Sequence, residues 1–189
     1  MAATGTKNAA NVSVGKPMAI GGVYAAPIGT PVPTDATTAL SEAFMNLGYI
    51  SDDGITNTVE SDSEAIKAWG GDTVLTVQTS RTETFTYTMI ESLNESVLKQ
   101  AYGEENVAEG TVKHNGATRG RWVYVFEILL TGEKVKRIVA PIGEVTEVGD
   151  VVYVDGEPIG YEVTVTAYPD DAGNTAYEYV AVISEGVGA

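Results

Sequence analysis

The stretch "TETFTYTMIESLNESVLKQAYG", residues 82–103, carries the clearest structural signals of the 189-residue chain. In its first half Phe85, Tyr87 and Met89 alternate strictly with polar residues. A period of two is that of a half-buried strand, so this segment is predicted to pair in a sheet. The polar face of the predicted strand is made of Thr84, Thr86 and Thr88.

The second half of the stretch predicts an α-helix over residues 92–102. From Leu93 onward, apolar residues recur at a spacing of four and would form one buried stripe. Ser92 and Glu95 have the spacing of a capping box, and Gly103 is suited to end the helix. No other segment gives a comparable helical pattern, so we expect one helix packed against a sheet.

The chain downstream of this helix is rich in β-branched and aromatic residues. "RWVYVFEILL" (121–130) and "KVKRIVA" (134–140) are predicted to form a hairpin across a three-residue connection. A second hairpin is predicted around Asp155-Gly156, where "DVVYV" would pair with the following strand. These signals predict a mainly β fold, a β-sandwich or open barrel with one flanking helix.

The chain shows no internal repeat and no linker, so residues 16–189 are expected to form one domain. Residues 1–15 are small and polar, and we expect them to be a flexible N-terminal arm.

An acidic segment, residues 48–72, precedes the predicted strand and is expected to be a long irregular loop. It raises three possibilities: a metal site, a catalytic pocket, or a surface that meets another copy of the chain. Trp69, followed by two glycines, would either fold against the domain or be offered to a partner. The acidic residues considered as contacts are Asp52, Asp53, Glu60, Asp62 and Glu64.

The residues for common enzyme chemistry are missing. The chain has no cysteine and one histidine, which excludes thiolate chemistry and histidine-based metal clusters. It also lacks a nucleophile-elbow motif and a phosphate-binding glycine loop. Asp52-Asp53-Gly54 and the segment 170–174 lack the spacing of calcium loops and are explained as turns. We therefore predict no catalytic residue, no metal site and no cofactor.

The net charge of −15 argues against binding nucleic acid through phosphate neutralisation. The charge is unevenly distributed, because a basic segment at 111–137 lies between two acidic ones. This pattern fits either a solvated surface or a head-to-tail assembly in which basic strands face acidic ones. No apolar run is long enough for a membrane span or a signal peptide, so a soluble protein made in the cytoplasm is expected.

The order of several segments resembles the major tail tube proteins of long-tailed, siphovirus-like bacteriophages. These segments are "GKPMAIGGVYAAPIGTPVPTDATTAL", "LGYISDDGI", "AWGGDTV", "TFTYTMIESLNESVLKQAYG" and "YEVTVTAYPDDAGNTAYEYV". The resemblance implies a structural virion protein whose hexameric rings stack into a tube for genome delivery. It also implies a β-sandwich with one helix and a long loop reaching the adjacent ring.

The resemblance implies that the chain's main partner is itself, with tape measure, tail terminator and distal tail proteins as further partners. DNA would pass through the tube without specific binding, and no membrane is involved. The expected location is the virion tail, after assembly in the host cytoplasm.

On charge grounds we predict an acidic lumen, lined by the threonine face of residues 84–88 or by an acidic C-terminal strand. We further predict that the acidic segment, with Trp69 as a possible anchor, meets Lys134, Lys136 and Arg137 of a neighbouring copy.

Two other classes stay open from the sequence. One is a secreted acidic β-sandwich that binds carbohydrate or a cell surface and is stabilised by calcium. The other is a tube protein of a type VI-like secretion system.

Overall fold

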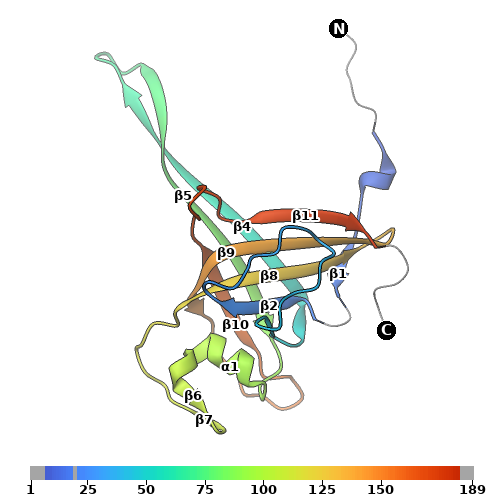
Figure 1. Cartoon of the computed structure of the whole chain (residues 1–189). Helices are drawn as coiled ribbons and strands as arrows, with labels where there is room; N and C mark the ends of the chain where they lie inside the picture. Colours follow the sequence, from blue (N-terminus) through green and yellow to red (C-terminus); the bar gives the residue numbers. More distant parts are fainter. Residues whose placement is uncertain (1–6, 19–20, 184–189) are drawn as a thin grey trace.

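A computed structural model describes residues 7–18 and 21–183 and shows a mainly β protein with one α-helix (Figure 1). The helix is α1 (Glu95–Tyr102), and single 3-10 turns occur at Ala9–Asn11 and Glu104–Asn106. The strands are β1 (Gly15–Pro17), β2 (Val23–Pro27), β3 (Met45–Asn46), β4 (Ile50–Lys67), β5 (Thr73–Met89), β6 (Val107–Ala108), β7 (Thr111–Val112), β8 (Arg121–Leu130), β9 (Lys134–Val148), β10 (Tyr161–Ala167) and β11 (Tyr177–Val182). The predicted fold class is confirmed.

The main sheet is antiparallel and runs β3-β2-β8-β9-β10-β5-β4, with β1 on β8 and β11 on β9. Strand β9 joins two layers, because its first half pairs with β11 and its second half with β10. We call β4, β5, β10 and residues 143–148 of β9 the threonine layer. The second layer contains β1, β2, β3, β8, β11 and the first half of β9.

The core lies between these two layers. Phe85 of β5 stacks on Phe126 of β8 with ring centroids 4.6 Å apart, and Tyr87 contacts the same ring edge-on. The pairing is possible because Phe85, Tyr87 and Met89 all point to one side of β5 and are buried. The alternation predicted for residues 82–89 is therefore confirmed, and it determines which face of the threonine layer meets the core.

The predicted helix is present but starts three residues later than expected. Asn94, not Ser92, is the N-cap, and its side chain accepts a hydrogen bond from the backbone N–H of Ser96. Leu93 consequently lies outside the helix and is exposed, although the rest of the apolar stripe is buried. Gly103 ends the helix with a positive φ of 94°. The capping-box prediction was wrong because asparagine caps a helix as well as serine does.

One of the two predicted hairpins is present. Strands β8 and β9 pair across residues 131–133, as expected. The prediction for "DVVYV" was wrong: residues 149–160 form an irregular connection between β9 and β10. Only the turn at Gly156, with φ of 86°, agrees with the sequence pattern. Val152, Tyr153 and Val154 have no neighbouring strand to pair with and remain exposed, whereas Val151 and Ile159 at the two ends of the segment pack partly against the core.

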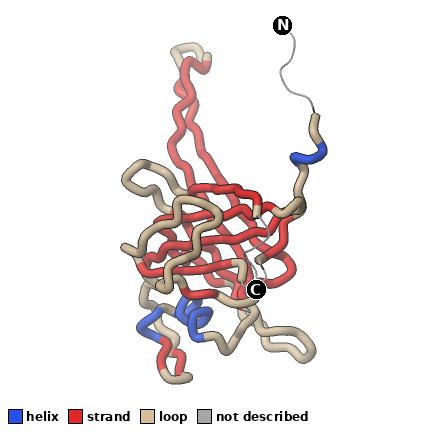
Figure 2. Tube along the Cα trace, turned by 45° about the vertical axis from the view of Figure 1, so that its right-hand side comes forward, coloured by secondary structure: helices blue, strands red, loops and turns tan. Residues whose placement is uncertain are grey.

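The acidic segment, residues 48–72, is not an irregular loop. Most of it is strand β4, which pairs with β5 from Ile55↔Tyr87 to Lys67↔Thr73 and turns at residues 68–72. The outer part of this hairpin projects from the body as a two-stranded ribbon (Figure 2). The sequence prediction failed because the threonines and acids of β4 become a strand only through pairing with β5. We call residues 56–82 the arm.

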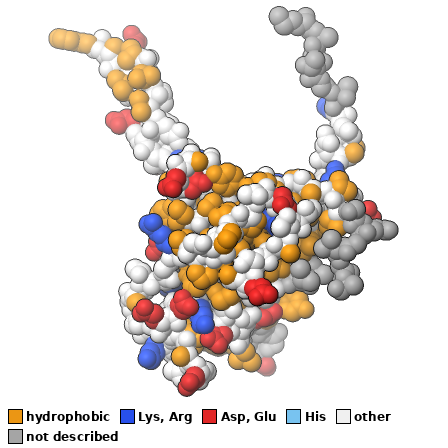
Figure 3. Space-filling view, viewed as in Figure 1, with side chains coloured by type: hydrophobic (Ala, Val, Ile, Leu, Met, Phe, Trp, Pro, Cys, Tyr) orange, Lys and Arg blue, Asp and Glu red, His pale blue; other side chains and the backbone are white. Residues whose placement is uncertain are grey.

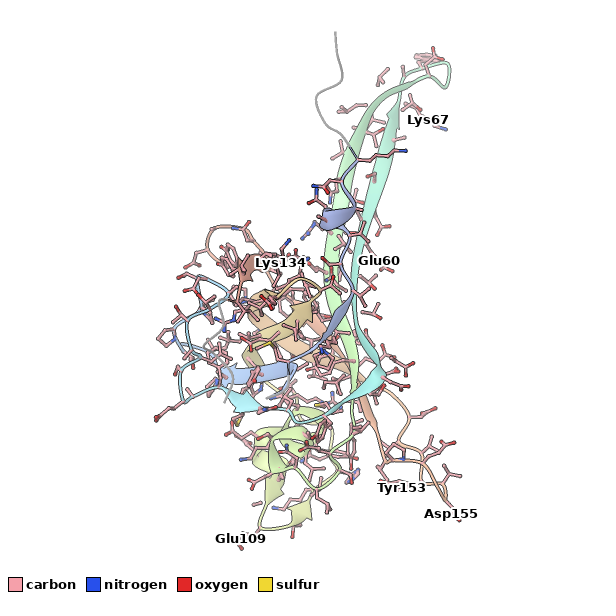
Figure 4. The ribbon with its side chains drawn as sticks, turned by 90° about the vertical axis from the view of Figure 1, so that its right-hand side faces the viewer. Glu60, Lys67, Glu109, Lys134, Tyr153 and Asp155 are labelled. Carbon is pink, nitrogen blue, oxygen red and sulfur yellow. The ribbon has the colours of Figure 1, made fainter. Side chains whose placement is uncertain are left out.

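The expected N-terminal arm, residues 1–15, lies partly outside the described residues. Residues 7–14 are exposed and leave the body on the same side as the arm formed by residues 56–82 (Figures 1 and 4).

Candidate assembly surfaces

Every residue of the arm, from Thr56 to Thr82, is exposed. The part beyond Val59 extends roughly 25–30 Å at about 3.3 Å per residue. A two-stranded ribbon in water is marginally stable at best, because neither face is covered. The arm is therefore a surface that gains stability when another molecule covers it.

The arm carries most of the acidic residues singled out from the sequence, but not all of them together. Glu60, Asp62 and Glu64 follow one another along β4, whereas Asp52 and Asp53 lie at the other end of that strand. Trp69 lies in the turn at the tip and is as exposed as a free residue, at 106%. Figure 4 shows Glu60 and Lys67 on the arm.

The arm also has an apolar strip that sequence reasoning missed. Ile66 lies opposite Leu75, and Val77 lies opposite Glu64, so Ile66, Leu75 and Val77 share one face of the ribbon. Hydrophobic side chains are visible along the arm and at its tip (Figure 3). In the sequence, the only sign of this strip was the spacing of two between Leu75 and Val77. That spacing indicates a shared face only once the partner strand is known.

The three predicted cations on β9 differ in availability. Lys134 lies at the arm end of the body (Figure 4), and Lys136 forms an ion pair of 2.8 Å with Glu178 at the surface. Arg137 is 4% exposed and is paired with Glu127 of its own chain. Its guanidinium also donates to the carbonyl oxygens of Asp35 and Thr38, at 2.9 and 2.8 Å. Arg137 is thus an internal clamp and is not a free cation for a partner.

The threonine layer presents a polar face away from the core. Thr84, Thr86 and Thr88 lie opposite Thr166, Thr164 and Glu162 of β10. The hydroxyls of Thr86 and Thr164 are 3.1 Å apart, and those of Thr146 and Thr166 are 2.8 Å apart. Residues 56–58, 82–88, 144–147 and 162–166, which supply this face, contain acidic residues but no lysine or arginine.

A buried carboxylate anchors the base of the arm to the body. Glu83 is 8% exposed and accepts hydrogen bonds from Asn57 of β4, from Arg81, and from the hydroxyl of Thr175 in the turn before β11. Arg81 in turn donates to Thr175 at 2.9 Å. Burial alone would raise the pKa of Glu83, but the hydrogen bonds from Thr175, Asn57 and Arg81 and the Arg81 charge lower it below 4.5.

This lowered pKa gives a testable pH dependence. The ionised Glu83 contributes stability that is fully present above the unfolded-state pKa and is lost as pH falls through the lower, folded-state pKa. We expect Glu83→Gln to reduce the free energy of unfolding at neutral pH. The difference from wild type should shrink as the pH falls below 4.5, the ordinary value. Urea titrations at several pH values measure this difference. Glu64→Gln on the exposed arm is the matched control, and a pH-independent difference for Glu83→Gln would contradict the assignment.

A second exposed apolar segment lies at the opposite end of the molecule from the arm tip. Val152, Tyr153 and Val154 are 61%, 71% and 52% exposed in the connection between β9 and β10. Figure 4 shows Tyr153 and Asp155 at that end, and Glu109 at the same end but on the other side of the molecule. Sequence reasoning assigned these residues to a strand and so missed them as a surface.

In the described part of the chain, no three His, Asp or Glu side chains are grouped so as to hold a metal ion. Among the same residues, no helix is long and apolar enough to cross a membrane.

The fold and these surfaces define a mainly β structural subunit with a projecting, uncovered arm. A family model described as phage tail tube protein matches residues 6–185, so the chain belongs to the phage tail tube protein family. Comparison with individually curated proteins gives no match. Membership implies a structural, non-enzymatic component of the virion tail that assembles with itself into a tube.

Proposed function

We propose that this chain forms six-membered rings that stack head to tail into a tube through which a phage genome is delivered. The observation that carries the proposal is the arm: a hairpin exposed on both faces that needs a covering partner. Supporting it, the arm and the β9–β10 connection lie at opposite ends of the threonine layer, because Tyr161 at the start of β10 pairs with Met89. Such a subunit has two different ends and suits heterologous stacking.

The threonine layer supplies the strands for an inner wall. Strand β4 is an edge strand, and residues 145–148 of β9 pair with β10 on one side only. Six copies of these four strands would close a barrel of roughly 48 Å backbone diameter, at about 4.8 Å per strand and a tilt of about 40°. Side chains would leave a lumen of roughly 38 Å, wider than duplex DNA.

The polar face of Thr84, Thr86 and Thr88 would then line the lumen. A wall of hydroxyls and carboxylates has no cations to bind the DNA phosphates, whereas lysines and arginines would bind the DNA as it passes. The gap between wall and duplex is about one Debye length, about 8 Å, so the acidic charge would still repel the DNA. The duplex would slide without specific contacts.

The arm would dock on a neighbouring copy through its acidic and apolar groups. Glu60, Asp62 and Glu64 are the anionic contacts, and Lys134 and Lys136 are their proposed partners, with Arg137 excluded by its burial. We also infer that tape measure, tail terminator and distal tail proteins are further partners of the tube. Assembly would take place in the host cytoplasm.

Negative-stain microscopy of the purified chain over a range of concentrations tests the proposal, with native mass spectrometry beside it. Six-membered rings or tubes are the expected result. A chain that stays monomeric at all concentrations, even with preformed tail ends added as initiators, would refute it.

The double variant Lys134→Glu and Lys136→Glu tests the charge pairing. Reversing both charges should raise the concentration needed for assembly by about tenfold or more, because like charges then face each other. The fold should persist, since a surface ion pair such as Lys136–Glu178 contributes only about 0–1 kcal/mol. Lys99→Glu with Lys113→Glu changes the net charge equally elsewhere and is the matched control. Normal tubes from the first variant would contradict the pairing.

The alternative of a secreted, calcium-stabilised binding module receives no support from the family match, which describes a tail tube protein.

A further inference from the structure

The second layer contains an apolar cavity next to the proposed cationic contacts. It has a volume of about 730 Å³ and lies between the segment 35–44 and strands β9 and β11. Its apolar walls come from Leu40, Phe44, Val135 and Val182. Val182 pairs directly with Lys134, so the cavity and that lysine are adjacent on the same sheet.

The wall of this cavity is held in place before any partner arrives. The Arg137 guanidinium, which also lines the cavity, donates to the carbonyls of Asp35 and Thr38. The Asp35 carboxylate accepts hydrogen bonds from the side chain and backbone of Thr38 and from Thr37. These bonds, that of the Thr38 side chain first, hold the pKa of Asp35 well below its ordinary value. A pre-organised cavity of this kind loses little conformational entropy on binding.

Trp69 is a large aromatic residue exposed enough to enter such a cavity. It is fully exposed at the arm tip, and Ile66 and Leu75 beside it are 48% and 54% exposed. Tryptophan is enriched among interface hot spots, which lie in well-packed, desolvated pockets. Trp69 lies in the turn at the end of the arm. The arm projects away from the body (Figures 1 and 4), so the cavity is not filled by the arm tip of its own chain.

The charges around the two partners are complementary. Lys67 lies two positions before Trp69 at the arm tip, and the exposed Glu42 is part of the cavity lining. These two residues carry opposite charges. Glu64, farther down the arm, would face Lys134 beside the cavity. We propose that the cavity receives Trp69 from the arm of a second copy, an inference that rests on the proposed tube assembly and names its receiving site.

The chain contains no cysteine, which permits a direct test. The double variant Trp69→Cys with Leu40→Cys is assembled, oxidised and run on a denaturing gel without reductant. A ladder of covalent multimers is expected from the double variant and not from either single variant. Tubes that give no ladder overturn the docking site while the proposed function stands. The double variant Trp69→Cys with Tyr153→Cys is the comparison. A ladder from this variant instead would place the arm tip at the opposite end of the neighbour, and it would also overturn the docking site.

Two leucine variants test the role of the cavity in assembly without an introduced disulfide. Leu40→Ala should raise the critical concentration for assembly by about tenfold, because it removes an apolar wall from a hot-spot contact. Leu93→Ala, at a residue 95% exposed and outside the cavity, is the matched control and should have no effect. Equal behaviour of both variants overturns the inference.

Fluorescence gives an independent readout. Trp122 is 4% exposed, so it should keep its emission, whereas Trp69 should shift to the blue when tubes form. Tubes that form with no shift overturn the inference, and a wild-type chain that forms no tubes even with preformed tail ends added overturns the proposed function itself.

Discussion

Replacing Arg137 by methionine is expected to lower the free energy of unfolding by about 3–5 kcal/mol. The substitution leaves the Glu127 carboxylate, 4% exposed, without its cation in the interior. It also removes the donor for the carbonyls of Asp35 and Thr38. A buried charge or polar group without a partner keeps its full desolvation penalty, which is why the expected loss is large. Urea unfolding at neutral pH measures it.

The control is a double variant in which both charges disappear. Arg137→Met with Glu127→Leu removes the pair and leaves no buried charge, so most of the lost stability should return. A double variant as unstable as the single one would show that the hydrogen bonds to the 35–38 segment, and not the ion pair, dominate. No loss in the single variant would contradict the internal clamp.

Removing the outer arm is expected to abolish tube formation while the body stays folded. Residues 62–80 are replaced by Asn-Gly, a pair that suits a tight hairpin turn between Ser61 and Arg81. The deleted residues are all exposed and contribute no core packing, so the free energy of unfolding should change little. Circular dichroism and urea unfolding report on the body, and microscopy reports on tubes.

A second variant separates the length of the arm from its apolar character. Ile66→Thr, Leu75→Thr and Val77→Thr keep a β-compatible arm of the same length but remove the apolar strip. If this variant also fails to assemble, the strip is the contact. If it assembles normally, the arm acts through its charges or its tip. Normal tubes from the deletion variant would contradict any role of the arm in assembly.

The sequence predicted those elements whose pattern is local and periodic. The alternation around Phe85 and Tyr87 determined the strand, its buried side and the threonine face, because a period of two has no other regular interpretation. The helix exists as predicted, but its N-cap is Asn94 instead of Ser92, since several polar residues near its start could each cap a helix.

The candidate site was predictable only in part. The acids of the arm and Trp69 could be named as candidate contacts because charge and an aromatic before two glycines are visible in the sequence, and their role as contacts stays a prediction. The strip of Ile66, Leu75 and Val77 was missed because it depends on which residues of two strands lie opposite each other. The same limit explains the connection at 149–160, where β-branched residues found no strand to pair with.

By itself, then, the sequence determined a mainly β fold with one helix, a polar strand face, and the separation of acidic and basic segments. These follow from periodicity and charge, which neighbouring residues carry. Only the tertiary structure decided that the acidic segment is a projecting hairpin, and that Arg137 is buried against Glu127 whereas Lys134 is partly exposed. Strand pairing and burial depend on residues far apart in the chain, as Arg137 shows in reaching Asp35 about a hundred positions away.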